Sequence, residues 1–323
     1  MLEPEKKSSI TIFLLICIAL IVLPFFMQGY WLRVVTSIMM FATITLALNF
    51  IAGYAGYAAF GNVVFMGIGA YTTAIFMVKA GIPWWIGVLS GGVLSALYAI
   101  LLGLPILRLR GHYFAICTLG VNEATKQFTL IWESLTEGGM GITLPLTSLK
   151  IQDFYRRINF IRFGLLLAFF LTTYFISRNR NGYALRAIRA NEDAAEMSGI
   201  RTTYYKVVAW AISAFFTGLV GGIYAYWFTF IEPANVFDIM IAVKAFVMML
   251  LGGGGTVLGP ILGATVLELV SELVWGEFLT LHMLIFGGII ILVILFMPSG
   301  MMEVFRRRYS LSALLVNLKE RSI

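Results

Sequence analysis

The sequence is dominated by apolar stretches about as long as a bilayer is thick, and these stretches constrain the fold more than any other feature. A helix crosses the hydrocarbon core with roughly 20 apolar residues. Only 12% of the 323 residues are charged, which excludes a water-soluble domain. We predict an all-α, polytopic integral membrane helix bundle of about eight to ten transmembrane segments. The apolar runs are 10–27, 33–52, 57–78, 84–107, 113–131, 160–177, 205–228, 240–252, 258–275 and 282–298.

The distribution of positive charge predicts the orientation of these spans, because cytoplasmic connections of membrane proteins carry an excess of Lys and Arg. With the amino terminus inside, fifteen of the 23 lysines and arginines fall on the cytoplasmic side. Both termini are therefore predicted to be cytoplasmic, and the net charge of +7 is assigned to membrane topology rather than to nucleic acid binding. The other basic residues are Arg33, Lys79, Lys150, Arg156, Arg157 and Arg162 outside, and Lys126 and Lys244 within spans.

The region 240–275 leaves two arrangements open. Its apolar runs are short and are separated by four glycines, 252–255. Such a break fits a tight loop between tilted helices. It also fits a re-entrant element, which membrane depth tolerates only where protein or a water-filled path covers the backbone. The stretch 252–263 resembles the small-residue stretch 53–69, although the match is too weak to establish an internal repeat.

Two connections are long enough to have structure of their own within what we predict to be a single transmembrane domain, 1–323. The external loop, 132–159, contains three glycines and one proline and is predicted to be an ordered cap or a flexible loop. The cytoplasmic loop, 178–204, contains a predicted helix at 183–198 that stops at Gly199. A basic cytoplasmic tail, 299–323, follows the last span.

Ionisable side chains inside the predicted spans are candidates for a translocation path, since each costs about 2.5 to 3.5 kcal/mol there. Glu123 and Lys126 are three residues apart and share a helical face, where they can pair. Lys244 lies in the eighth predicted span, and Glu268 and Glu272 share a face in the ninth. Two interpretations stay open: structural pairing, and a polar path that contacts a polar solute.

Glycines within the spans also have two interpretations. Small residues let helices approach closely in lipid, where little hydrophobic force drives helices together. The same residues can line a path or let its helices shift. The glycines concerned are Gly53, Gly56, Gly61, Gly67, Gly69, Gly218, Gly221 and Gly222.

The residue types that carry catalysis or nucleotide binding do not occur in usable combinations. A Walker A phosphate loop has Lys and then Ser or Thr after its last glycine. In the run LGGGGT (251–256), the residues after the last glycine are instead Thr256, Val257 and Leu258. His112 and His282 lie near helix ends without a nucleophile, base and orienting group around them. Cys17 and Cys117 lack the spacing of a disulfide framework or zinc site. The sequence predicts no enzyme, no cofactor and no metal.

The segment 192–199 has a structural and a functional interpretation. It can be a solvated, salt-bridged amphipathic helix whose charges need no partner. It can also be a docking element, in which Ala194 and Ala195 let the backbone approach a partner's groove and Gly199 turns the chain back sharply. In that case the flanking Arg186 and Arg189 meet acidic groups of the partner.

Five segments resemble one family of transporters. DAAEMSG (193–199), which begins at Asp193, resembles the acidic-Ala-Ala-x-x-x-Gly core of the loop by which permeases of ATP-binding-cassette (ABC) importers engage their ATPases, although no Ile-x-Leu-Pro tail follows. Over roughly residues 30–300 the chain is similar to the permeases of branched-chain amino acid ABC importers, specifically the M-type subunit. Urea importer permeases share these segments. The other four are GYAAFGNVVFMGIGAYT (56–72), LRLRGHYFAICTLG (107–120), GYALRAIR (182–189) and LGGGGTVLGP (251–260).

The resemblance implies half of a translocation pore for leucine, isoleucine and valine in a bacterial inner or plasma membrane. It implies a homologous H-type permease, two cytoplasmic ATP-binding subunits and an extracytoplasmic solute-binding protein as partners. One alternative is a permease of a urea or amide importer. Another is a stand-alone secondary transporter or channel, with Glu123, Lys126 and Glu268 as ion sites. The resemblance assigns ATPase coupling to Arg186, Arg189, Asp193, Ala194, Ala195 and Gly199.

Overall fold

The structure is a computed structural model of the chain, and it describes residues 29–145, 150–277, 287–288 and 300–302. The predicted first span, 10–27, lies outside the described residues. So do most of the predicted last span, 282–298, and most of the basic tail, 299–323.

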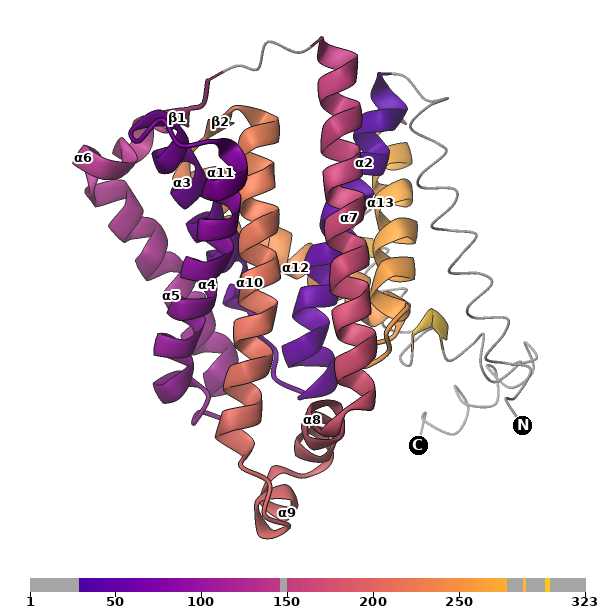
Figure 1. Ribbon diagram of the computed structural model, residues 1–323. Helices are drawn as coiled ribbons and strands as arrows, with labels where there is room; N and C mark the ends of the chain where they lie inside the picture. Colours follow the sequence, from indigo (N-terminus) through magenta and orange to yellow (C-terminus); the bar gives the residue numbers. More distant parts are fainter. Residues whose placement is uncertain (1–28, 146–149, 278–286, 289–299, 303–323) are drawn as a thin grey trace.

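Long helices packed side by side form the body of the protein (Figure 1). Six segments of the described chain are long and apolar enough to cross a membrane: Tyr30–Tyr54, Phe60–Val78, Trp84–Ile106, Ile151–Arg178, Thr202–Phe228 and Pro233–Gly252. These segments confirm the prediction of a polytopic α-helical membrane protein. The long helices are α2 (Tyr30–Leu48), α3 (Val64–Val78), α4 (Trp84–Ile106), α5 (His112–Ile131), α7 (Ile151–Arg178), α10 (Thr202–Phe228), α12 (Ile239–Gly252) and α13 (Gly259–Glu277).

Helix α7 begins at Ile151, well before the predicted start at residue 160. Its first turns are amphipathic, because Phe154 and Ile158 are buried four residues apart while Arg157 is exposed. The charged residues of these turns hide the helix from a search for apolar runs. Residues 151–159 are therefore helical and continuous with the span, where the sequence predicts a connecting loop.

The rest of the predicted external loop, as far as it is described, is an ordered cap. It contains α6 (Glu133–Thr136), the 3₁₀ helix η3 (Gly138–Met140) and the short strand β1 (Ile142–Thr143). Strand β1 pairs in antiparallel fashion with β2 (Phe230–Ile231), which is followed by the short helix α11 (Pro233–Val236). The pairing joins this cap to the end of α10 (Figure 1).

Helices α3, α4 and α10 pack through glycines. A Cβ atom on Gly69 would overlap the carbonyl of Gly218, and one on Gly221 would overlap the carbonyl of Met66. A Cβ on Gly91 would come within 2.8 Å of the Gly69 carbonyl oxygen. Close backbone approach of this kind provides the packing between helices in lipid. The geometry therefore supports the packing interpretation for these glycines.

Two breaks between helices lie against each other: the break between α2 and α3, and the break between α12 and α13. Helix α2 continues into the π-helix η1 (Asn49–Tyr54), and the 3₁₀ helix η2 (Phe60–Val63) leads into α3. The amide of Asn49 donates to the Thr256 carbonyl (2.8 Å) and its oxygen accepts from the Gly255 amide (2.7 Å). These bonds fix the segment between α12 and α13 to the end of α2. The segment is a tight turn, in which the Thr256 hydroxyl donates to the Gly253 carbonyl at 2.7 Å. π-Helical turns often occur at functional sites.

The single helix predicted at 183–198 is wrong, because the structure has two: α8 (Arg180–Ala190) and α9 (Glu192–Met197). Asn191 separates them with an extended backbone, and its side-chain oxygen accepts from the Ala194 amide at 3.1 Å. Asparagine is a favoured N-cap residue for this reason. The predicted stop at Gly199 is confirmed by its φ of 82°. Helix α9 projects beyond the ends of the long helices (Figure 1).

Candidate functional site

Glu192, the first residue of α9, lies at the centre of a polar network. The Nζ of Lys206 donates to Glu192 Oε1 at 2.6 Å, and the hydroxyl of Tyr57 donates to Oε2. Lys206 also donates to the Tyr57 hydroxyl (3.0 Å) and to the Leu107 carbonyl (2.7 Å). Arg110 Nε lies 3.6 Å from Glu192. The network joins α9 to α10, to the connection between α2 and α3, and to the residue that follows α4.

The charges of this network compensate one another. Lys206 is buried, and a buried ammonium requires a neutralising partner. Burial alone would raise the pKa of the Glu192 carboxyl. The hydrogen bonds from Lys206 and Tyr57, together with the positive charges of Lys206 and Arg110, outweigh burial and lower the pKa below its ordinary value. Burial, followed by the hydrogen bond to Glu192, raises the pKa of the Tyr57 hydroxyl. At neutral pH Glu192 is therefore a carboxylate and Tyr57 an uncharged phenol.

Two of the three arginines of α8, Arg186 and Arg189, contact the chain's own backbone. Arg189 donates to the Gly53 carbonyl, and its Nη1 lies 3.5 Å from the Gly254 carbonyl oxygen. Arg189 therefore reaches the place where both helix breaks meet. Arg186 donates to the carbonyl of Ser177 and, at 3.1 Å, to that of Gly182. In the described structure these guanidinium groups fix α8 to the bundle.

The outward face of α9 is acidic with one apolar tip. Asp193, Ala194 and Met197 are exposed, and Met197 is 91% exposed. Arg110 pairs with Asp193 at 2.7 Å on this exposed side. Ala195 is instead buried within the chain's own core. The two small residues of the predicted docking element thus face in opposite directions, and only Ala194 is accessible to a partner.

Lys244 and Glu268 form an ion pair between α12 and α13, with Nζ and Oε2 2.6 Å apart in a geometry that is not that of a hydrogen bond. Ser37 of α2 donates to the other carboxylate oxygen at 2.7 Å. The Lys244 ammonium also lies 4.4 Å from the centre of the Phe41 ring. Glu268 is only 4% exposed, so the pair holds three helices together inside the bundle.

Helix α5 has an exposed face whose middle turns are polar, between the exposed apolar side chains of Ile116 and Ile131. The ion pairs within the described chain do not include the predicted pair of Glu123 with Lys126, and Glu123 instead accepts from Gln127 at 2.8 Å. Gly120, Glu123 and Gln127 recur at helical spacing and are exposed. Helix α5 is also absent from the six described segments that are apolar enough to span a membrane. An exposed charge at membrane depth is unfavourable against lipid and favours a water-filled path or a partner protein.

Arg162 is a buried cation that the charge count placed outside. It lies in α7 at 2% exposure, donates to the Thr36 carbonyl (2.9 Å) and stacks over the Trp227 ring at 4.3 Å. Its Nε and Nη2 have no hydrogen-bond partner within the described part of the chain. Its position inside the apolar run 160–177 is the sequence signal for a buried cation.

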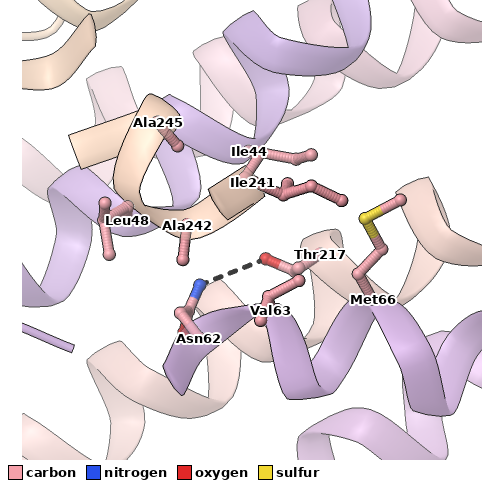
Figure 2. A pocket seen from close by; sticks show the side chains of 9 residues that line it. All are labelled: Ile44, Leu48, Asn62, Val63, Met66, Thr217, Ile241, Ala242 and Ala245. Atoms are coloured by element: carbon pink, nitrogen blue, oxygen red, sulfur yellow. Dashed lines mark hydrogen bonds between the residues drawn. The ribbon is translucent and has the colours of Figure 1, made fainter. Parts of the chain in front are cut away.

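A small pocket lies among α2, η2, α3, α10 and α12 (Figure 2). Its walls are mostly aliphatic, and Figure 2 shows Asn62 donating to Thr217 across one side at 3.5 Å. Asn62 is further bonded to Trp210, whose Nε1 lies 3.2 Å from the amide oxygen. The space is about that of one water molecule, so it does not accommodate an amino acid in this conformation.

These observations define a multi-pass helical membrane protein with a projecting helix tied into the bundle and a polar face on one helix. Residues 30–294 match the family described as branched-chain amino acid transport system / permease component. The chain belongs to this family and is a multi-pass protein of the cell membrane.

Three relatives illustrate the family. The high-affinity branched-chain amino acid transport system permease protein LivM of Salmonella typhimurium is 30% identical over 95% of this chain and 78% of its own length. A probable LivM permease of Methanocaldococcus jannaschii is 25% identical, over 80% and 89%. The S. typhimurium permease LivH is also 25% identical, over 81% and 91%. The relatives are thus transport permeases of two kinds, LivM and LivH. No solved structure matches the chain.

Proposed function

We propose that this chain is a permease subunit of an ATP-driven importer for leucine, isoleucine and valine and forms half of its translocation pore. Its family and the names of its relatives support this substrate class over urea or another amide. The observation that carries the proposal is α9, a short helix that projects beyond the bundle and is joined to α10 through Glu192 and Lys206. Such a helix is suited to receive force from a separate motor.

The proposed complex contains a second, homologous H-type permease, two cytoplasmic ATP-binding subunits and an extracytoplasmic solute-binding protein. The similarity to both LivM and LivH supports a pair of related permeases. The excess of Lys and Arg supports a cytoplasmic location for α9 and for both termini. The cap of α6, β1 and β2 then faces the binding protein. We assign the chain no ATP hydrolysis of its own.

The outward face of α9 is the proposed docking surface for an ATPase. Met197 offers an apolar side chain for a groove, and Asp193 beside it favours basic groups of the partner. Ala194 lets the partner approach the helix backbone, and Gly199 returns the chain to α10. Arg189 supports the docking surface indirectly by holding α8 against the two helix breaks.

The polar face of α5 is the proposed wall of the pore, with Glu123 exposed along it and Lys126 beside it. This face would meet the second permease across a path for a polar solute. Lys244 and Glu268 are proposed to stabilise the packing of α12 and α13 on α2. The carboxylate of Glu268 is already engaged by Lys244 and Ser37, which disfavours it as the ion site of a stand-alone secondary transporter.

The docking surface is tested by co-purification of the full complex from cells that express its subunits together. Ala194→Arg places a long cation on the outward face of α9, and Ser134→Arg adds the same side chain in exposed α6 at the opposite end. We expect wild type and Ser134→Arg to retain the ATPases, and wild type to support ATP-driven leucine uptake. Ala194→Arg is expected to lose both. Retention of no ATPase by wild type, or full function of Ala194→Arg, would contradict the proposal.

A further inference from the structure

We propose that Glu192 is the positioning residue through which movement of α9 reaches the membrane-spanning helices. This inference rests on the proposed function, because it assigns the route by which ATPase motion enters the pore. The Glu192 carboxylate accepts hydrogen bonds from Lys206 of α10, at 2.6 Å, and from the hydroxyl of Tyr57, a residue that precedes α3 in the chain.

The two neighbouring acids at the start of α9 differ in exposure, although Arg110 lies near both. The side chain of Asp193 is 69% exposed and pairs with Arg110, whose side chain is 51% exposed. The side chain of Glu192 is only 12% exposed and faces the bundle. Exposed ion pairs contribute little, whereas a buried pair is strongly coupled because loss of one partner leaves a buried charge. Asp193 is therefore placed for docking and Glu192 for transmission.

The covalent connection from α9 to α10 is a poor transmitter. It passes through Gly199, whose positive φ marks a sharp turn, and helix α10 resumes only at Thr202. Thr202 does donate to Glu196 of α9 at 2.6 Å. The Glu192–Lys206 pair bypasses the turn and contacts α10 in its second turn. A displacement of α9 therefore acts on α10 through the ion pair without first straightening the glycine turn.

Lys206 has no spare donor. Its ammonium has three protons, and its three acceptors are Glu192, the Tyr57 hydroxyl and the Leu107 carbonyl. Within the described structure Glu192 is the only carboxylate paired with Lys206. If α9 withdrew alone, the ammonium would be left buried and uncompensated. Movement of the base of α10 with α9 avoids this state.

The network contacts three parts of one tightly packed unit. Lys206 belongs to α10, Tyr57 leads into η2 and α3, and Leu107 ends α4. These are the three helices that glycines bring into backbone contact, as at Gly69 and Gly218. A group of helices packed this closely moves as a unit more readily than it deforms. We infer that Glu192 directs the force on α9 into α3, α4 and α10 together.

The first test is a double-mutant cycle on the full chain in detergent, read as the midpoint of thermal unfolding. The variants are Glu192→Gln, Lys206→Met and the double substitution, with Glu133→Gln in exposed α6 as a charge-matched control. We expect both single variants at Glu192 and Lys206 to lower the midpoint and the double variant to lose less than their sum. Additive losses would overturn the inference, because they would mean that the two groups are not coupled.

The second test measures leucine uptake per ATP hydrolysed in the reconstituted complex. We expect the double variant to retain its ATPases and their hydrolysis while uptake per ATP falls by about tenfold or more. Tyr57→Phe, which removes one hydrogen bond and little volume, is expected to lower the same ratio to a smaller extent. A merely structural role would lower assembly and leave this ratio unchanged.

The outcomes separate the inference from the proposed function. Wild-type uptake per ATP in the double variant and in Tyr57→Phe would overturn the role of Glu192 while leaving the importer intact. If the wild-type chain binds no ATPase and shows no ATP-driven uptake, both the proposed function and the transmission role are wrong.

Discussion

Replacing Glu268 with glutamine is expected to destabilise the packing of α12 and α13 on α2. The substitution removes the charge that neutralises Lys244 at 2.6 Å. The side chain of Glu268 is 5% exposed and that of Lys244 is 21% exposed. Breaking a buried ion pair by removing one partner costs about 3 to 5 kcal/mol. Glutamine keeps an oxygen that can accept from Ser37 and Lys244, so we expect the lower end, about 3 kcal/mol.

The assay is unfolding of the full chain in detergent for Glu268→Gln, Lys244→Met and the double variant Lys244→Met with Glu268→Leu. The double variant leaves no unpaired charge and keeps similar volume, so its stability is expected to return to within about 1 kcal/mol of wild type. Unchanged unfolding in both single variants would refute the stabilising role. A stable double variant that assembles but does not transport leucine would instead place the pair in the translocation path.

Three further outcomes follow from particular contacts. Gly218→Val, whose Cβ would meet Ser95 and the Gly91 carbonyl, should lower the unfolding midpoint far more than Gly164→Val in open space. Because the folded pKa of Glu192 is lowered, its stabilisation is complete above its unfolded pKa and is lost as pH falls through the folded value. When the pH is lowered, the unfolding midpoint should therefore fall less in Glu192→Gln than in wild type. Asn191→Ala should cost about 1 kcal/mol and speed hydrogen exchange of α9 amides.

Several spans could be located from the sequence because apolar length is the property that the bilayer selects. The run 84–107 corresponds to α4 at Trp84–Ile106, and 205–228 corresponds to α10 at Thr202–Phe228. The start of helix α7, by contrast, is not marked by apolar length. Its first turns are stabilised by one buried face and carry charge on the other, so they do not register as an apolar run.

Side-chain partners were harder to predict than helices. The spacing of Glu123 and Lys126 indicates a local pair, but Glu123 instead accepts from Gln127, four residues along the helix. Lys206 was counted only as a cytoplasmic charge, and its contact with Glu192 depends on how α9 folds back against α10. Nothing in local spacing reveals which helices become neighbours.

The loop 178–204 lies between these cases. Gly199 could be identified as a stop because a positive φ favours glycine. The break at Asn191 had a signal in the N-cap preference of asparagine before two acids, but good helix formers on both sides concealed it. The opposite directions of Ala194 and Ala195 required the structure, since they depend on the orientation of α9.

The central claim is tested most directly by uptake of radiolabelled leucine into proteoliposomes that contain this chain, its H-type partner and both ATPases, with the solute-binding protein outside. We predict uptake that requires internal ATP and every subunit, and that isoleucine and valine inhibit while urea does not. Leucine uptake by this chain alone under an ion gradient, or ATP-driven uptake of urea in place of leucine, would contradict the account.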